Sequence, residues 1–347
     1  YGSFEHFKNE YCTILTKENN SKKKIALFGH FTGILGIGED IRIIAEALSE
    51  RGYFIDYYSL GFDYKEQNFE FNGVKSWQEY LAIYDANIFC MPAFDLLTYF
   101  NKVGVEIFTT TLNIGIFQWE LEYFPVESKF ALDLMHKVCS ISTFASKSIS
   151  LTYKKNVNTL NLPFLNLPLI SEYNREYFKL PEESFLFFFA FDLNSFITRK
   201  NPLGTIEAFQ RTFKKYEDVK LVIKSMGNCT DTIWNECKRR ALTDNRIILI
   251  DEVFTKNELN GLLNCMNTVV SLHRAEGFGR LMGEALLLEI PIIASNYSGN
   301  LDYLNNENSY LVDGKLVPIY ENEYLFWRNQ VWFEPDLNQA SLKIKEV

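Results

Sequence analysis

The stretch from Thr268 to Asn300, TVVSLHRAEGFGRLMGEALLLEIPIIASNYSGN, decides the fold of the second half of the chain. Residues 268–272 form a short β-branched apolar run, which is typical of a buried strand. A loop over 273–279 ends in Gly-Phe-Gly and precedes a predicted helix over 280–289. A second apolar strand is predicted over 290–294, with a proline near its start. This order of strand, loop, helix and strand is typical of a βαβ unit.

Two carboxylates stand out in this stretch. Glu276 lies in the loop, and Glu284 lies eight residues later inside the predicted helix. Six apolar residues surround Glu284 in sequence: Leu281, Met282, Ala285, Leu286, Leu287 and Leu288. A helix that is apolar on nearly all sides is buried, and a buried carboxylate needs hydrogen-bond partners to offset its desolvation. The sequence therefore predicts a buried helix whose carboxylate has polar partners.

The overall composition predicts a globular protein with two domains. The chain has 347 residues, which is too long for a single simple core. Hydrophobic residues make up 47% and charged residues 23%, so the chain is not of the disordered class. The net charge of -9 argues against a general nucleic-acid binder, although a local basic pocket for phosphate is compatible with it.

The cysteines and histidines give no metal or disulfide pattern. The six cysteines, none in a C-x-x-C spacing, are Cys12, Cys90, Cys139, Cys229, Cys237 and Cys265. We interpret them as buried reduced thiols in a cytoplasmic protein. The four histidines are scattered, so no metal cluster is expected. No run spans a bilayer and no signal peptide is found, and the start at Tyr1 without a methionine suggests a trimmed chain.

The first half opens with a predicted βαβ unit. A strand over 25–29 leads through a glycine-bearing loop to a helix ending near Arg51, and a second strand follows over 53–60. The loop glycines fall as G-x-x-G-x-G at 33, 36 and 38, not as G-x-G-x-x-G, so they weakly indicate close approach of a phosphate or sugar. The basic residues 22–24 are expected to be a solvated approach to the strand, with contact to anionic lipid as the alternative.

Strand and helix signals then alternate along the whole chain. In the first half, strands are predicted over 86–91, 111–117 and 138–141, and helices over 127–137 and 144–152. In the second half, strands are predicted over 185–191, 219–224 and 246–250, and helices over 257–264 and 336–345. Such alternation predicts parallel sheets with helices on both faces. The 30 phenylalanines are expected to fill the core, with contact to a lipid-linked substrate as the less supported alternative.

The helix that begins at Pro202 has the most specific local signal. Asn201 is a natural N-cap and proline is favoured at the first helical position. Its expected buried stripe consists of Leu203, Ile206, Phe209 and Phe213.

Prolines at 163, 168 and 181 interrupt a polar, aromatic stretch, where we expect the domain boundary. The predicted division is an acceptor-binding domain over 1–170, a donor-binding domain over 171–330, and a C-terminal helix over 331–347 that packs back on the first domain.

Four places in the chain resemble the retaining glycosyltransferases of family 4, which have the GT-B architecture of two Rossmann-like domains. The first is an E-x7-E signature, Glu276 to Glu284, preceded by Ser271-Leu-His-Arg-Ala and followed by Pro-x-x-Ala-Ser and Ser-Gly-Asn. The others are Asp192 to Pro202, the segment Gln118-Trp-Glu-Leu with Phe124-Pro, and the glycines from 33 to 38. The resemblance covers most of the chain from about residue 24 to about residue 335. It implies a GT-B fold with the two sheets facing each other across a cleft.

The resemblance also implies a role for each part of the opening stretch. Glu284 is expected to bind the ribose of a sugar nucleotide, and Glu276 is expected to contact hydroxyls of the donor sugar. The backbone N–H groups of Gly277, Phe278 and Gly279 would face the diphosphate at the N-terminus of the helix that begins at Arg280, where the helix dipole favours an anion.

The expected cationic side of the diphosphate site is Lys200 with Arg199. In many relatives an arginine lies several residues before this lysine, where the present chain has Ser195. Fixed cations stabilise the charge that develops on a departing diphosphate, and the chain has no D-x-D metal motif. The implied catalytic residues are Glu276, Lys200 and Arg199. The implied donor-binding residues are Glu284, Gly277, Phe278, Gly279, Arg280, His273, Lys224, Gly33, Gly36 and Ser195, and for His273 a purely structural role is the alternative.

The acceptor side is less defined, because the loop where some relatives have a histidine reads Met91-Pro-Ala-Phe-Asp95. The candidates are His30, Trp119 and Glu120, of which Glu120 could instead cap the next element.

The sequence therefore predicts a metal-independent hexosyltransferase without cofactor. It would use a nucleoside-diphosphate sugar, with GDP-mannose favoured by the form of the Ser271 to Gly279 loop, and a glycan or lipid-linked acceptor. The departing phosphate would accept the acceptor's proton in a same-face mechanism. The alternatives are a catalytically silent GT-B module that binds sugar nucleotides and a phosphorylase that uses pyridoxal phosphate. The expected location is the cytoplasm, with the inner face of the membrane as an alternative.

Overall fold

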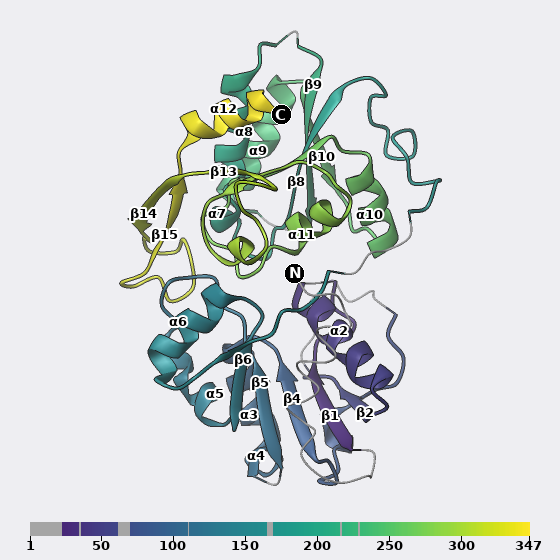
Figure 1. Cartoon of the computed structure of the whole chain (residues 1–347), viewed down its shortest axis with the longest axis vertical. Coiled ribbons are helices and arrows are strands. Elements are labelled where there is room, and N and C mark those ends of the chain that lie inside the picture. The colour runs from purple at the N-terminus through teal and green to yellow at the C-terminus, as the bar shows by residue number, and fades with distance from the viewer. Residues whose placement is uncertain are drawn as a thin grey trace. The chain divides into compact units, whose positions relative to one another are not determined.

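The computed structural model describes residues 23–34, 36–61, 70–109, 111–164, 169–215, 217–227 and 230–347. Lys22, Cys12, Cys229 and Pro168, which entered the sequence predictions, lie outside the described residues. The chain divides into two compact units, Tyr1–Pro163 and Phe164–Val347 (Figure 1). In the described part of the chain, no helix has the length and apolar character needed to cross a bilayer.

The described strands of the first unit form one parallel sheet in the order β3-β2-β1-β4-β5-β6-β7. The strands are β1 (Lys24–Gly29), β2 (Phe54–Tyr58), β3 (Val74–Lys75), β4 (Ala86–Cys90), β5 (Leu112–Ile116), β6 (Lys137–Ser140) and β7 (Asn158–Thr159). The helices are α2 (Gly36–Glu50), α3 (Ala93–Val103), α4 (Glu106–Thr109), α5 (Lys129–Asp133) and α6 (Thr143–Tyr153), with 3-10 turns at Trp77–Glu79 and Val126–Ser128. The chain order reverses between β1 and β4, so the carboxyl ends of these two strands form a topological switch point.

The described strands of the second unit form another parallel sheet in the order β10-β9-β8-β11-β12-β13. The strands are β8 (Phe185–Asp192), β9 (Val219–Met226), β10 (Ile247–Asp251), β11 (Thr268–Ser271), β12 (Ile292–Ser295) and β13 (Tyr310–Val312). The helices are α7 (Ile197–Lys200), α8 (Pro202–Thr212), α9 (Thr232–Thr243), α10 (Lys256–Asn264), α11 (Arg280–Leu287) and α12 (Leu337–Glu346), with a 3-10 turn at Gly299–Asp302. Here the switch point lies between β8 and β11.

A two-stranded antiparallel ribbon extends the second unit. It consists of β14 (Gly314–Pro318) and β15 (Val331–Pro335), joined by residues 319–330, and it lies apart from the six-stranded sheet (Figure 1). The poorer sequence pattern after Val312 did not predict these strands.

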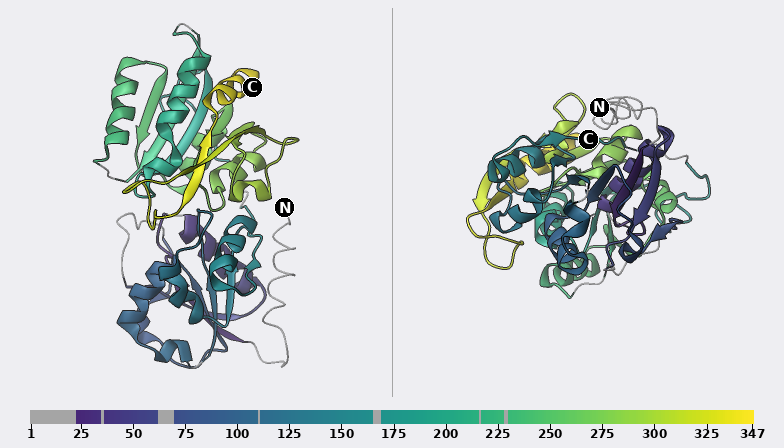
Figure 2. Two further views of the ribbon diagram at one scale, coloured as in Figure 1. Left: turned by 90° about the vertical axis from the view of Figure 1, so that its left-hand side faces the viewer. Right: turned by 90° about the horizontal axis from the view of Figure 1, so that it is seen from below.

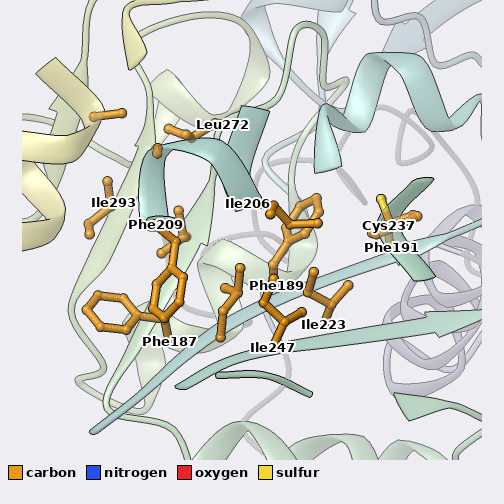
Figure 3. Packing of buried hydrophobic residues seen from close by; sticks show 14 of the residues in the cluster. Phe187, Phe189, Phe191, Ile206, Phe209, Ile223, Cys237, Ile247, Leu272 and Ile293 are labelled. Carbon is orange, nitrogen blue, oxygen red and sulfur yellow. The ribbon is translucent and has the colours of Figure 1, made fainter. Parts of the chain in front are cut away.

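The phenylalanines of the second unit fill its core, as the composition predicted. Phe187, Phe189 and Phe191 point from one face of β8 into a cluster with Ile206 and Phe209 of α8 (Figure 3). Leu203 and Phe213, the other members of the predicted stripe, are only partly buried against this cluster. The predicted cap is present, because the Asn201 side chain accepts a hydrogen bond from the Gly204 N–H at 3.3 Å.

The C-terminal helix α12 belongs to this same core, and its expected packing on the first domain stays a prediction. Ala340 and Ile344 are buried in the cluster, and α12 lies beside α8 in both directions of view (Figures 1 and 2). The hydroxyl of Thr212 on α8 donates to the carbonyl oxygen of Ser341 at 3.1 Å. The apolar face of α12 is therefore covered within the second unit.

Two predicted helices are shorter than expected. The region 127–137 contains a 3-10 turn and then only α5, because His136 already joins the sheet: its N–H donates to the Asn113 carbonyl at 2.9 Å and its Nδ1 accepts from the Asn113 N–H at 3.0 Å. The helix predicted to end at Glu289 ends at Leu287, whose side chain is 43% exposed. Four successive residues of α11, 282–285, are buried and point to all sides of the helix, so the predicted burial around Glu284 is confirmed and exposure is limited to the C-terminal end.

Candidate active site

Three of the predicted site residues meet at the β8/β11 switch point. Arg199 and Lys200 lie on α7, which follows β8, and Glu276 lies in the loop after β11. Lys200 Nζ contacts Glu276 Oε2, and Arg199 Nη1 lies 3.5 Å from the same oxygen. We call these three side chains the charge cluster. The rule that ligands bind at the carboxyl ends of strands at a switch point makes this cluster the candidate site.

The charge cluster keeps Glu276 ionised. Burial acts to raise the pKa of the Glu276 carboxyl, but the charges of Lys200 and Arg199 outweigh this effect and hold the pKa at about 2. The side chains are 16% exposed for Glu276, 17% for Lys200 and 8% for Arg199, so water screens the charges only in part. At neutral pH the cluster carries two positive charges and one negative charge.

Arg199 is fixed by its neighbours on both sides. Its Nε donates to the Ser195 carbonyl at 2.9 Å, and its Nη1 donates to the Ala275 carbonyl at 3.1 Å. Arg199 therefore holds the Glu276 loop through backbone contacts as well as through charge. The side chain of Ser195 contacts the end of β8, where its hydroxyl donates to the Asp192 carbonyl at 2.8 Å.

The short helix α7 lies between two residues with left-handed backbone. Phe196 at its N-terminus has φ of 58° and Asn201 at its C-terminus has φ of 55°. Such conformations cost free energy in residues other than glycine and persist where surrounding contacts impose them. For Asn201 these contacts include its side-chain amide, which donates to the Leu272 carbonyl at 2.9 Å.

Close packing requires glycine at 299, and a left-handed backbone favours it at 279, next to the Glu276 loop. A Cβ on Gly299 would lie 1.9 Å from the Gly277 carbonyl oxygen, so the two loops touch at a point that accepts no side chain. Gly279 has φ of 86° and is the N-cap of α11, so no capping side chain covers the first N–H groups of this helix. This arrangement is suited to binding an anion at the N-terminus of α11.

Glu284, the second carboxylate of the signature, has a partner that the sequence did not predict. Lys256 Nζ contacts Glu284 Oε1, with side-chain exposures of 24% and 9%. Lys256 opens α10, where Thr255 and Glu258 form a capping box. The capping-box signal, Thr-x-x-Glu, was present in the sequence and could have placed Lys256 at a helix start.

His273 is held by hydrogen bonds within the second unit. Its ring is fully buried, Nδ1 lies 3.0 Å from the Ser271 hydroxyl, and Nε2 lies 3.1 Å from the Tyr297 carbonyl oxygen. A carbonyl oxygen only accepts hydrogen bonds, so Nε2 carries the proton and Nδ1 accepts from Ser271. Burial lowers the pKa of His273, although the charge of Glu276 acts in the opposite direction. The alternative reading of His273 as a satisfied core histidine is thus favoured over direct contact with the donor.

Phe278 and Arg280 are predicted donor-side residues whose side chains make aromatic contacts. The buried Phe278 ring stacks on Phe164 at 5.1 Å between ring centres, and the Arg280 guanidinium lies 5.6 Å from the Phe278 ring centre. The Phe278 ring therefore packs on Phe164, the first residue of the second unit, and only the backbone N–H of Phe278 is a candidate for binding the diphosphate.

Lys224 is a buried lysine near the end of β9. Burial lowers its pKa to about 8, although Asp192, Asp251 and Glu252 act in the opposite direction. Its Nζ lies 5.4 Å from the centre of the Phe254 ring. It is one strand away from the charge cluster, since β9 is next to β8.

In the first unit, His30 lies at the β1/β4 switch point. Its Nε2 lies 3.4 Å from Asp95 Oδ2, and Asp95 belongs to the first turn of α3. The loop Met91 to Asp95, which lacks the histidine of some relatives, thus supplies a carboxylate that contacts the histidine of the β1 loop. The sequence prediction named His30 but did not find Asp95.

The remaining predicted site residues of the first unit have individual surroundings. Trp119 is buried, and its indole N–H donates to the Tyr123 carbonyl at 2.8 Å, while its place on the acceptor side stays a prediction. Glu120 next to it is partly exposed. Gly33 is buried and its carbonyl accepts from Arg42 Nη1 at 3.0 Å, while Gly36 is exposed at the start of α2.

Within the described residues, no three histidine, cysteine, aspartate or glutamate side chains gather in an arrangement that could hold a metal ion. Of the cysteines that the structure describes, four are free thiols, and three of these, Cys90, Cys139 and Cys237, are buried.

A known family model matches most of the second unit. Residues 172–324 match the model of the family described as Glycosyl transferases group 1. The charge cluster and Glu284 lie inside the matched residues. No curated protein matches the chain.

Solved structures share the fold of the whole chain. HepE from Anabaena, in complex with UDP and glucose, has a TM-score of 0.62 and 13% identity over 84% of this chain and 86% of that one. Sucrose-phosphate synthase from Thermosynechococcus elongatus has a TM-score of 0.65 and 13% identity over 94% and 89%. WaaG, a glycosyltransferase involved in lipopolysaccharide biosynthesis, has a TM-score of 0.60 and 10% identity over 93% and 90%. The predicted GT-B fold is thus confirmed.

Proposed function

We propose that the protein is a retaining glycosyltransferase that moves a hexose from a nucleoside-diphosphate sugar to a glycan or lipid-linked saccharide. The observation that carries this proposal is the charge cluster at the β8/β11 switch point, inside the residues that match the glycosyltransferase group 1 model. Two cations suit a diphosphate, and an ionised carboxylate suits the hydroxyls of a sugar.

In the proposed reaction, the bond between C1 of the donor sugar and the β-phosphate oxygen breaks. The acceptor oxygen bonds to C1 on the same face, and its proton passes to the departing phosphate oxygen. Lys200 and Arg199 stabilise the negative charge that develops on this phosphate, and fixed cations do so without reorganising during the step. No separate general base is required by this route.

Glu276 has two roles in the proposal. Before the donor binds, it neutralises part of the charge of Lys200 and Arg199, which it contacts. When the donor is bound, it accepts hydrogen bonds from the sugar, because its low pKa keeps it ionised at neutral pH. Glu284 would bind the ribose hydroxyls, and its contact with Lys256 orients its carboxylate.

The proposed donor is GDP-mannose, because the loop sequence from Ser271 to Gly279 resembles that of mannosyltransferases and related enzymes. UDP-glucose is the comparison donor, because a structural neighbour, HepE, has been solved with it.

Thermal unfolding with GDP-mannose, UDP-glucose, GDP and UDP tests donor binding. At a hundred times its dissociation constant, the true donor should stabilise the protein by about 2.7 kcal/mol. Glu276→Gln should abolish slow hydrolysis of the bound donor, whereas Glu321→Gln, an exposed glutamate of the same unit, should leave it unchanged. If none of these four compounds stabilises the protein, the proposal is ruled out.

Two other outcomes identify the alternatives. Tight donor binding without any turnover, in the presence of varied saccharide acceptors, would show a silent sugar-nucleotide module. An absorption band of a pyridoxal Schiff base in the purified protein would indicate a phosphorylase.

A further inference from the structure

The backbone of Arg274 joins α7 to the β14–β15 ribbon. Its N–H donates to the Arg199 carbonyl oxygen at 2.7 Å, and its carbonyl oxygen accepts from the Phe333 N–H at 2.9 Å. Arg199 is a residue of α7 and Phe333 is a residue of β15. The end of α7 that carries the charge cluster is thus connected to the ribbon by two consecutive backbone hydrogen bonds.

The side chain of Arg274 strengthens the same connection. Its Nη2 lies 2.8 Å from Glu334 Oε2, and its guanidinium carbon lies 5.2 Å from the centre of the Trp332 ring. Trp332 is almost fully buried. A guanidinium that stacks on an aromatic face and pairs with a carboxylate has its orientation fixed in two directions. Arg274 therefore holds three successive residues of β15, from Trp332 to Glu334.

The loop of the ribbon contacts the other end of α7. The ring centre of Tyr324, a buried residue of this loop, lies 4.9 Å from that of Phe196. Phe196 is the left-handed N-cap of α7. The ribbon thus contacts the N-cap of α7 directly through Tyr324, and it is connected to Arg199 near the other end of α7 through Arg274.

The ribbon also contacts the loop that supports Glu276. The Phe333 ring stacks on Tyr297 with 5.1 Å between centres and 5° between planes. The next residue, Ser298, accepts a hydrogen bond from the Glu276 N–H at 3.2 Å. Both halves of the charge cluster, the cations and the carboxylate, therefore have contacts leading to the same ribbon.

We propose that the β14–β15 ribbon positions the charge cluster, and that Tyr324 and Arg274 are the positioning residues through which it acts. The inference rests on the proposed function for its catalytic consequence. Helix α7 has only four residues, which is far too short to be stable by itself. Its position must come from contacts at its two ends, and a shift of about 1 Å in a charged group weakens transition-state stabilisation strongly.

The test compares Tyr324→Ala with two matched variants. Tyr324→Phe keeps the ring that contacts Phe196, and Tyr320→Ala removes an exposed tyrosine of the same loop, 68% accessible to solvent. The first measurement is hydrogen exchange of the amides of residues 196–201 in the protein without ligand. We expect about tenfold faster exchange in Tyr324→Ala and wild-type exchange in the two other variants.

The second measurement is the kinetics of donor turnover. In Tyr324→Ala, kcat should fall about tenfold while KM for the donor changes less, because the cations act mainly on charge that develops in the transition state. Tyr324→Phe should restore kcat. Equal exchange and equal kcat in Tyr324→Ala and Tyr320→Ala would overturn the inference. If the wild-type protein binds no sugar nucleotide, the proposed function fails, while the exchange measurement still decides whether the ribbon positions α7.

Discussion

Glu276 is ionised because Lys200 and Arg199 offset the cost of its burial. Its pKa of about 2 in the folded protein lies below the ordinary value of 4.5. Its ionisation therefore stabilises the folded state above about pH 4.5, and this contribution is lost as the pH falls from there towards 2. The motif predicted that Glu276 contacts the donor sugar, which stays a prediction; its contact with Lys200 depends on where α7 ends, and no local pattern encodes that position.

The variant Lys200→Met tests this contribution. Removal of the ammonium raises the pKa of Glu276, so the fall in unfolding free energy between pH 6 and pH 3 should be smaller by about 1 kcal/mol than in the wild type. Urea unfolding at the two pH values measures it. Lys215→Met, at an exposed position of the same unit, is the control and should show the wild-type difference. An unchanged pH dependence in Lys200→Met would contradict the charge coupling.

Gly299 tests the close approach of the two loops at the site. An added Cβ would lie 1.9 Å from the Gly277 carbonyl oxygen, and backbone cannot move aside as a side-chain tip can. Gly299→Ala should therefore lower the free energy of unfolding by about 3 kcal/mol. Gly36→Ala, where an added Cβ has open space, should change it by less than about 1 kcal/mol. Chemical denaturation compares the two; similar losses would argue against the packing described.

At the scale of elements, α10 supplies Glu284 of α11 with a partner, Lys256, that the sequence did not predict. Lys256→Met leaves the Glu284 carboxylate, 9% exposed, without the ammonium that it contacts, and should cost about 2 kcal/mol of stability. The double variant Lys256→Met with Glu284→Gln removes the charge as well and should recover part of this loss. Thermal or urea unfolding of both single variants and the double variant gives the coupling energy. If the change in unfolding free energy of the double variant equals the sum of the changes in the two single variants, the two groups do not interact.

The elements that the sequence predicted well are those with strong local signals. The run of phenylalanines in β8 and the Asn201-Pro202 start of α8 were both confirmed. Helix α3 and helix α9 were missed, although Pro92 and the Asp231 N-cap precede them. The ribbon escaped prediction for a different reason: its strands are stabilised by contacts with Arg274 and Tyr297, which are distant in sequence.

At the scale of the whole molecule, the boundary between the units falls before Phe164. This is seven residues before the predicted boundary after residue 170, and it lies within the proline-containing stretch where the boundary was expected. The Phe164 ring packs on Phe278 and lies 4.9 Å from the Tyr303 ring centre, and a Cβ on Gly283 would strike it at 2.1 Å. Phe164 is therefore a structural part of the second unit and not of a free linker. Predicting this contact would require knowing that Gly283 leaves room for a ring from 119 residues earlier.

A fragment of residues 164–347 should consequently fold alone and keep donor binding, because the charge cluster, Glu284 and the covering helix α12 all belong to it. We expect its affinity for the donor to lie within about tenfold of that of the whole chain, and its transfer activity to be absent if the acceptor binds the first unit. Calorimetric titration with the donor that stabilises the whole chain measures the affinity. The same fragment with Phe164→Ala should unfold more easily by about 3 kcal/mol, since the ring packed between Phe278 and Tyr303 is lost. A fragment that folds but binds no donor would show that the first unit contributes essential donor contacts, as predicted for Gly33 and Gly36.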